Sequence, residues 1–200
     1  MNDEERHAAD MKQRQQEHRA RQRETRNPER GLVLVHTGNG KGKSSSAFGV
    51  IVRALGWGHR VAVVQFIKGK WQTGERQFFE SLDGTVDWHT MGDGFTWDTQ
   101  DKAGDTEAAQ RAFDHARTLL KSGDYDLVVL DEINIALRYD YLSADQVQAG
   151  LEERHKRTSV ILTGRDAPES LCSYADLVSE MREIKHPYKA GIRAQRGIDF

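Results

Sequence analysis

The 200-residue sequence predicts a single α/β domain with a mostly parallel β-sheet flanked by helices, preceded by a polar helical arm. From Gly31 onward, short apolar runs alternate with longer amphipathic runs, which is typical of βαβ units. A second observation is the stretch TGNGKGKSSSAFG at residues 37–49, which is rich in glycine and lysine and lies between an apolar run and a helix-compatible run. We therefore expect an arm over residues 1–30 and one α/β domain over residues 31–200.

The first 30 residues differ from the rest of the chain in composition. They contain 8 Lys/Arg and 7 Asp/Glu and almost no large apolar residue. Gln, Glu, Arg and Ala favour helix, so we expect a solvent-exposed helix that ends near Asn27-Pro28. The net charge of +1 attracts nucleic acid only weakly. Two interpretations stay open: a mobile tail, or an arm that folds over a ligand or a second subunit.

The elements of the main domain follow from the apolar pattern. The expected strands are the short apolar runs at residues 32–35, 61–67, 86–89, 127–130, 160–162 and 177–178. The expected helices are the amphipathic runs at residues 44–55, 106–121, 143–155 and 167–174. Ser143 is a natural N-cap for the third of these helices.

Composition excludes several classes of protein. The formal net charge of -2 disfavours a nucleic-acid-coating protein. A single cysteine, Cys172, excludes an intramolecular disulfide framework and is typical of a reducing compartment. No apolar run approaches the roughly 20 residues that span a bilayer, and the polar N-terminus lacks the apolar core of a secretory signal. We expect a cytoplasmic protein with no membrane or nucleic-acid partner.

The glycine-rich loop has the features of a P-loop, whose pattern is G-x-x-x-x-G-K-[ST] between a strand and a helix. Thr37 replaces the first glycine, but Gly38 and Gly40 keep the loop bare, and Gly42, Lys43 and Ser44 complete the pattern. Glycines let backbone N–H groups approach phosphate oxygens, and the following helix directs its positive end at the anion. The loop predicts a P-loop NTPase-like (RecA-like) fold that binds a nucleoside triphosphate, although a plain glycine-rich turn is the alternative.

Within this motif, Lys43 is placed to reach phosphate oxygens and the Ser44 hydroxyl to ligate Mg²⁺. Arg53, on the following helix, is a weaker candidate for contact with the nucleotide, because an arginine at such a position more commonly lies on the surface. The predicted nucleotide-binding residues are Gly38, Asn39, Gly40, Lys41, Gly42, Lys43, Ser44, Ser45 and Arg53.

Two carboxylates follow the apolar run at residues 127–130. Asp131 and Glu132 occupy the position at which P-loop proteins hold an acidic residue near the metal, at the carboxyl ends of parallel strands. An ordinary charged strand end is the alternative. Together with the loop, the pair predicts a site for Mg²⁺, with Mn²⁺ as a substitute, made by Ser44, Asp131 and Glu132. Which of the two carboxylates ligates the metal directly stays open.

Six stretches in order resemble the ATP:corrinoid adenosyltransferases of the cobalamin pathway. They are TGNGKGKSSSAFG, VVQFIKGKWQTGE, GDGFTWDTQD, VVLDEINIAL, ILTGRDAP and the terminal KHPYKAGIRAQRGIDF. The resemblance extends from about Gly31 to Phe200, and the polar arm is similar in character. One departure is Ser44-Ser45, where this family usually has Thr-Thr; both residue types carry a hydroxyl.

The resemblance implies that a cobalt(I) corrinoid (cobalamin, cobinamide or cobyrinic acid diamide) attacks C5′ of ATP and that triphosphate leaves. The substrate's cobalt is the nucleophile, so no protein nucleophile is needed, and Cys172 has no evident catalytic setting. The loop, with Lys43 as a catalytic residue, would hold the triphosphate in a reversed sense. A homodimer and a reduced flavoprotein as electron donor are also implied. A P-loop NTPase or small-molecule kinase, which would release ADP, is the alternative enzyme; a nucleotide-dependent regulatory or nucleic-acid-binding module is a third hypothesis.

The resemblance also assigns catalytic roles to Phe95 and Trp97 of GDGFTWDTQD. In this family such an aromatic pair displaces the lower axial ligand of the corrinoid and favours four-coordinate cobalt(II), which is easier to reduce. From the residues alone, anchoring of the loop to the core is the favoured explanation, and only the resemblance favours contact with the corrin. The histidines His36, His89 and His186 are expected to be structural. The basic C-terminal residues, Arg182 to Arg196, either face phosphate or corrin carboxamides or form a solvated surface.

Overall fold

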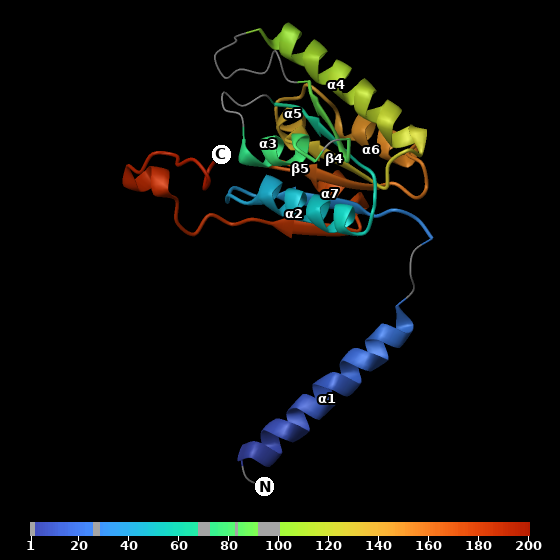
Figure 1. The fold of residues 1–200 in the computed structure, drawn as a ribbon, viewed down its shortest axis with the longest axis vertical. Coiled ribbons are helices and arrows are strands. Elements are labelled where there is room, and N and C mark those ends of the chain that lie inside the picture. Colours follow the sequence, from blue (N-terminus) through green and yellow to red (C-terminus); the bar gives the residue numbers. More distant parts are fainter. Residues whose placement is uncertain (1–2, 26–28, 68–72, 83, 92–100) are drawn as a thin grey trace.

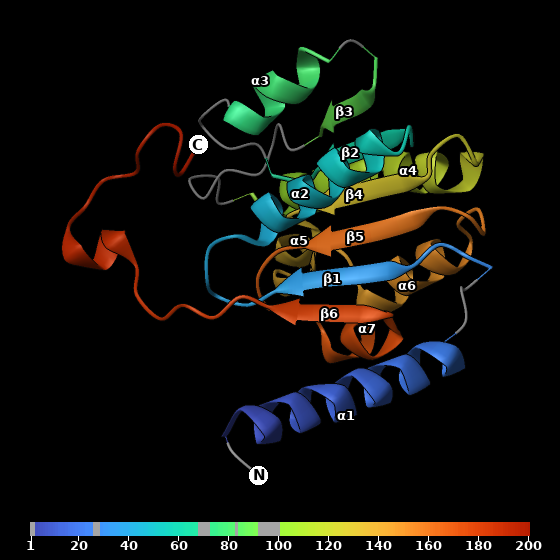
Figure 2. The same ribbon diagram turned by 60° about the horizontal axis from the view of Figure 1, so that its bottom comes forward.

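The computed structural model describes residues 3–25, 29–67, 73–82, 84–91 and 101–200. At its centre lies a six-stranded sheet with the order β3-β2-β4-β5-β1-β6, and every pair of neighbouring strands is parallel (Figures 1 and 2). The strands are β1 (Val33–Thr37), β2 (Val61–Gln65), β3 (Val86–Thr90), β4 (Leu127–Asp131), β5 (Ser159–Thr163) and β6 (Leu177–Glu180). Since all strands run the same way, their carboxyl ends meet along one edge of the sheet.

Alternate residues of the central strands enter two separate cores, as the period of two in a strand requires. On β4, for example, Val128 and Leu130 belong to one apolar cluster, whereas Leu127 and Val129 belong to the other. All four are buried. This burial on both faces explains why the central strands read as continuous apolar runs rather than as alternating ones.

Helices cover both faces of the sheet (Figure 2). The helices α2 (Lys43–Gly56) and α3 (Gly74–Glu80) supply apolar side chains to one core. The other core contains side chains of the helices α4 (Lys102–Ser122), α5 (Ile133–Arg138), α6 (Ala144–Glu152) and α7 (Glu169–Tyr174). A short 3-10 helix, η1 (Pro187–Ala190), lies in the C-terminal segment. The architecture is therefore three layers: helices, sheet, helices.

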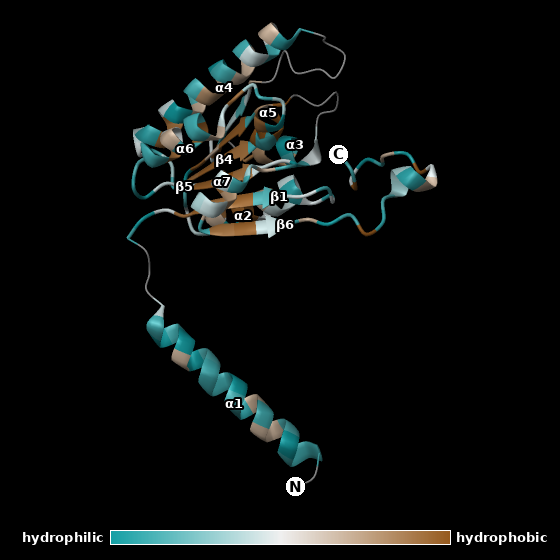
Figure 3. Cartoon of the chain, turned by 180° about the vertical axis from the view of Figure 1, so that it is seen from behind, coloured by the Kyte–Doolittle hydropathy of each residue, from teal (hydrophilic) through white to brown (hydrophobic). Residues whose placement is uncertain are grey.

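The polar arm forms a helix, α1 (Asp3–Glu24), that buries no residue and lies apart from the sheet (Figure 3). Its surface is hydrophilic nearly all round, because Met11 is its only large apolar side chain. The helix ends at Glu24, a little before the expected Asn27-Pro28. Directly after this end, the Thr25 hydroxyl donates a hydrogen bond to the carbonyl oxygen of Gln22 at 2.8 Å.

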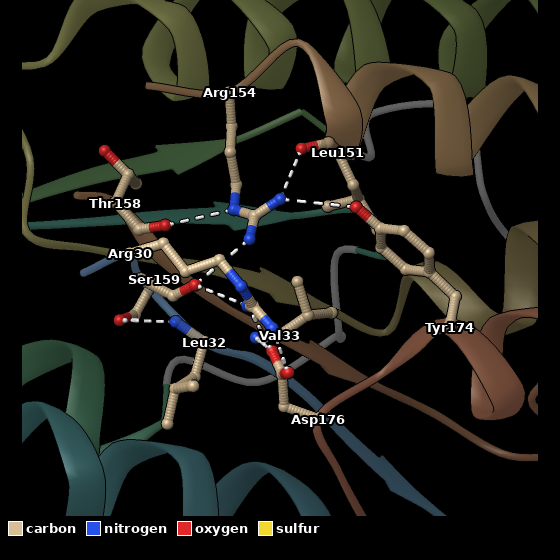
Figure 4. A network of polar contacts seen from close by, with 10 residues as sticks. Arg30, Leu32, Val33, Leu151, Arg154, Thr158, Ser159, Tyr174 and Asp176 are labelled. Carbon is tan, nitrogen blue, oxygen red and sulfur yellow. Dashed lines mark hydrogen bonds and ion pairs between the residues drawn. The ribbon is translucent and has the colours of Figure 1, made fainter. Parts of the chain in front are cut away.

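A network of polar contacts fastens the start of β1 to the amino edge of the sheet (Figure 4). The Arg30 guanidinium donates to both carboxylate oxygens of Asp176, at 2.8 and 2.5 Å, and the Val33 backbone N–H donates to the same carboxylate at 2.9 Å. Arg154 donates to the carbonyl oxygens of Gly31, Leu151 and Thr158 and to the hydroxyl of Tyr174.

Most expected elements are confirmed. All six strands and all four helices of the main domain are present, with ends that shift by a few residues, and the sheet is entirely rather than mostly parallel. The Ser143 side chain caps α6 by accepting a hydrogen bond from the backbone N–H of Gln146. The short helices α3 and α5 were not predicted. Within the residues that the structure describes, no helix is long and apolar enough to cross a membrane.

Candidate nucleotide-binding site

The glycine-rich loop connects β1 to α2 at the carboxyl edge of the sheet. Gly38 and Gly42 have positive φ angles of 96° and 109°, which glycine adopts without strain. A Cβ atom on Gly38 would lie 2.5 Å from the carbonyl oxygen of Met181, and one on Gly40 would lie 2.8 Å from the same oxygen. Gly38 and Gly42 are therefore required for the backbone conformation. Gly38 and Gly40 are also required because the chain after β6 packs closely against them.

The N-terminus of α2 differs from those of α3, α4 and α6, which Thr73, Asp101 and Ser143 cap. Its N-cap is Gly42, which has no side chain to cap the helix, and its first turn has no acidic residue. The backbone N–H groups of this first turn and the helix dipole therefore favour an anion at this end.

The Lys43 side chain is buried across the loop. Its ammonium donates to the carbonyl oxygens of Gly38 at 2.9 Å and Gly40 at 2.7 Å. Burial lowers its pKa, and the negative charge of Glu132 partly opposes that shift. An ammonium has three donors, so one remains to bond a phosphate oxygen.

Asp131 ends β4 and is almost completely buried. Its carboxylate accepts from the Thr163 hydroxyl at 2.8 Å and from the Gln65 amide at 3.3 Å, and it is also hydrogen-bonded to the Ser44 hydroxyl. Burial raises the pKa of Asp131, and these three hydrogen bonds oppose the shift. The loop serine and the strand-end carboxylate, 87 positions apart in sequence, are therefore direct neighbours.

Glu132 follows at the start of α5 with a positive φ of 61°. Its backbone N–H donates to the Thr163 hydroxyl at 2.8 Å. Burial, followed by the charge of Asp131, raises the pKa of the Glu132 carboxyl to about 7, while Lys43 and Arg165 oppose the shift. Two carboxylates held close together in a poorly solvated place are expected to favour a bound cation.

The oxygen donors fit a hard divalent cation such as Mg²⁺. The described residues contain no group of three or more His, Cys, Asp or Glu that could hold a metal by themselves. A hydroxyl and one or two carboxylates are nevertheless what Mg²⁺ takes from a protein when phosphate and water complete its six ligands.

The structure brings most of the predicted loop residues together. Asn39, Lys41, Gly42 and Ser45 are exposed on the loop, while Gly40 and Lys43 are buried. Arg53 is exposed ten residues along α2 from Lys43, about 15 Å along the helix axis, and its role stays a prediction. Phe95 and Trp97 lie outside the described residues.

Sequence reasoning missed two residues beside the carboxylates, Thr163 and Gln65. Thr163 is buried on β5 between the loop strand and β4, and it contacts both Asp131 and Glu132. Thr163 ends a run that is otherwise apolar, and Gln65 is the polar residue within the apolar run at residues 61–67, at the end of β2. A polar residue that closes a buried parallel strand was the available signal.

The surroundings of His36 and Cys172 indicate structural roles for these two side chains. His36 is buried, and its ring Nδ1 lies 3.3 Å from the carbonyl oxygen of Lys43. The Cys172 Sγ lies 3.9 Å from the carbonyl oxygen of Ala167, and burial raises the pKa of this thiol, which disfavours the reactive thiolate.

Comparison with known proteins decides the family of this P-loop chain. Residues 29–200 match the family model described as ATP:corrinoid adenosyltransferase BtuR/CobO/CobP. The chain belongs to this family. It is 52% identical to the corrinoid adenosyltransferase of Pseudomonas aeruginosa over 172 residues, which are 86% of this chain and 85% of that protein. It is 46% identical to the corrinoid adenosyltransferase of Escherichia coli K12, over 86% of this chain and 87% of that protein.

Membership makes this chain a transferase of adenosylcobalamin biosynthesis whose substrates are ATP and a corrinoid. The NTPase or kinase hypothesis is not favoured. A solved archaeal protein, the flagellar accessory protein FlaH of Methanocaldococcus jannaschii, aligns over 76% of this chain and 71% of its own, with a TM-score of 0.49 and 12% identity. A likeness of that size adds nothing to the assignment.

Proposed function

We propose that the chain transfers the 5′-deoxyadenosyl group of ATP to the cobalt(I) of a corrinoid at the carboxyl edge of its sheet, with the loop at residues 38–45 holding the triphosphate. The observation that carries this assignment is the contact between the loop and β4, where the Ser44 hydroxyl is hydrogen-bonded to the Asp131 carboxylate and the next residue towards the N-terminus, Lys43, is buried. The cobalt attacks C5′, the C5′–O bond breaks, and its electron pair leaves with the triphosphate.

The chain's own part in this step is to stabilise the charge that grows on the leaving triphosphate. The uncapped N–H groups of α2 and the ammonium of Lys43 are fixed before the substrate arrives. Such donors need no reorganisation as charge develops, which is the principle of an oxyanion hole. Lys41, exposed on the same loop, adds a second positive charge.

Ser44, Asp131 and Glu132 are the residues that would hold Mg²⁺ or Mn²⁺. When bound, the cation would share the negative charge of the triphosphate. Asp131 is the better candidate for the ligand, because the Ser44 hydroxyl already contacts its carboxylate.

Phe95 and Trp97 complete the proposal on the corrinoid side, where they would displace the lower axial ligand. Replacing both with alanine should leave MgATP binding and the reaction of pre-reduced cob(I)alamin unchanged, while the reaction that starts from cob(II)alamin fails. Electron paramagnetic resonance should show four-coordinate cobalt(II) in the wild type and much less in the double variant. An undiminished signal in that variant would refute this role.

The assembly is a further part of the proposal. A homodimer, in which the arm covers an active site, gives the exposed helix α1 a function, and a reduced flavoprotein would supply the electron. Light scattering under turnover should report a dimer, and deletion of residues 1–26 should lower activity. A monomer, or a fully active deletion variant, would contradict it.

The reaction itself has a direct test. Protein, MgATP and chemically reduced cob(I)alamin should produce a light-sensitive cobalt–carbon bond and inorganic triphosphate in equal amounts, detected by absorbance and phosphorus NMR. Formation of ADP and orthophosphate, with the corrinoid unchanged, would instead indicate an ATPase.

A further inference from the structure

The C-terminal segment, residues 181–200, returns to the phosphate loop. Directly after β6 its backbone bonds the loop twice: the Met181 N–H donates to the Thr37 carbonyl oxygen at 2.8 Å, and the Gly40 N–H donates to the Met181 carbonyl oxygen at 2.7 Å. The chain then swings outward through η1 and comes back, so that the C-terminus lies near the start of α2 and α3 (Figures 1 and 2).

The last residues place a carboxylate on the loop. The Asp199 carboxylate lies 2.5 Å from the Lys41 ammonium, and its other oxygen accepts from the Gln195 backbone N–H at 2.8 Å. The terminal turn, residues 195–200, is closed by a bond of 2.8 Å from the Gly197 N–H to the Phe200 carbonyl oxygen. The Asp199 side chain is only 10% exposed, whereas Lys41 is 50% exposed.

Three large apolar side chains of this segment do not pack against the described part of the domain: Ile184, Tyr188 and Ile198 are 91%, 79% and 80% exposed. Phe200, the last residue, is half-buried. Burial of apolar surface is the main source of stability for a docked segment, so polar contacts matter for the return of this chain to the loop. The ion pair of Asp199 with Lys41 is one of these, and it lies where the triphosphate is proposed to bind.

A carboxylate on a phosphate-loop lysine has the same sign of charge as the ligand and competes for the same ammonium. We propose that the terminal turn is a nucleotide-responsive latch: Asp199 holds Lys41 when the loop is free, and a triphosphate displaces it and releases residues 195–200. This inference rests on the proposed binding of triphosphate by the loop. Because linkage is reciprocal, a turn that the triphosphate displaces must weaken triphosphate binding by the same factor.

The same segment offers a matched control. Lys189 pairs with Glu183, and among the described residues this pair makes no hydrogen bond or ion pair with the phosphate loop. Asp199→Asn removes the competing charge and keeps an oxygen that can accept from the Gln195 N–H. Glu183→Gln removes a carboxylate of the same segment without touching Lys41.

The test is calorimetric titration of wild type, Asp199→Asn and Glu183→Gln with MgATP and with inorganic triphosphate. The Lys41 side chain is half exposed, which weakens its ion pair with Asp199, so we expect Asp199→Asn to bind both ligands about two- to fivefold more tightly. Glu183→Gln should match the wild type. Equal or weaker binding by Asp199→Asn, while the wild type binds normally, would overturn the latch alone. Absence of binding to the wild type would overturn the proposed function and the latch with it.

Limited trypsin digestion provides an independent measurement, since Arg193 is exposed next to the turn and Arg196 is exposed within it. Inorganic triphosphate should speed cleavage at these sites in the wild type and in Glu183→Gln. Asp199→Asn should be cleaved at the faster rate with or without ligand. A wild-type cleavage rate that triphosphate does not change would refute release of the turn.

Discussion

The carboxyl groups at the two edges of the sheet have pKa values that are shifted in opposite directions. At the amino edge, Arg154 and Asp176 each meet several partners, and the Arg30 guanidinium lowers the pKa of Asp176 to about 2. At the carboxyl edge, burial raises the pKa of Asp131, and the pKa of Glu132 rises to about 7. The amino edge stabilises its ionised groups, whereas the carboxyl edge holds ionised groups at a cost in stability.

Two cations make the contrast concrete. Arg154 and Lys43 both donate to backbone carbonyl oxygens, Arg154 at the amino edge and Lys43 across the phosphate loop. Arg154 joins β1 to the end of α6 and to β5, so it links distant parts of the chain. The hydrogen bonds of the Lys43 ammonium go to its own loop, within five residues. The first arrangement contributes to folding; the second holds a charge in position for a ligand.

The largest expected effect is a loss of activity from Asp131→Asn. Removing the charge that faces Ser44 should lower turnover by about a hundredfold, the upper range for groups that orient a metal site. The melting temperature should not fall, because the variant removes a buried charge that repels Glu132. Turnover and calorimetric melting measure both. A melting temperature that fell markedly together with turnover would contradict the proposed difference between the two edges.

Arg154→Met should show the opposite pattern. It removes the side-chain donor to the carbonyl oxygen of Thr158 and one of the donors to those of Gly31 and Leu151, which keep the Arg30 guanidinium and a backbone N–H, so the free energy of unfolding should fall by about 2–3 kcal/mol. Turnover per folded molecule should be unchanged. Urea denaturation gives the first quantity, and an assay well below the melting temperature gives the second. A specific loss of turnover would place this residue in the active site after all.

Lys43→Ala removes a charge-assisted contact worth about 1.5–3 kcal/mol to the ligand. Turnover or ATP affinity should drop at least tenfold while the fold is retained, as circular dichroism can confirm. Arg53→Ala, at an exposed position of the same helix, tests separately whether the predicted contact of Arg53 with the nucleotide exists. Wild-type kinetics for Lys43→Ala would refute the role of the loop.

The smallest effect is a difference in the pH dependence of stability. Between pH 2 and 4 the unfolded chain binds more protons at Asp176 than the folded one, so stability should rise with pH by about 1–2 kcal/mol. Between pH 4.5 and 7 the folded protein binds more protons at Glu132, so stability should fall as pH rises, by about 2–3 kcal/mol without metal.

Urea titrations in a metal chelator across both pH windows test this pair of slopes. Asp176→Asn should flatten the acid window only, and Glu132→Gln the neutral window only. If one variant flattened both windows, or neither did, the two carboxylates would not differ as proposed.

Much of the fold and of the loop could be predicted from the sequence. Apolar runs located all six strands, and TGNGKGKSSS located the loop and the helix that follows it. The helix α5 was missed because INIAL continues the apolar composition of β4, and the change of direction occurs at Glu132 through a positive φ that side-chain preference does not signal. The helix α3 is only seven residues long, too short for a clear helical period.

The sequence by itself determined the local chemistry: which residues form strands, where glycine permits a bare loop, and which charges lie at strand ends. These depend on neighbours in the chain, which composition and spacing describe directly. Only the tertiary structure decided that β5 lies between β1 and β4, and so that Thr163 bridges to Asp131 and Glu132. It also decided that Asp199 pairs with Lys41, 158 positions earlier. Such pairings follow from the order of strands and the path of the chain, which are set by packing between distant segments rather than by preferences along the sequence.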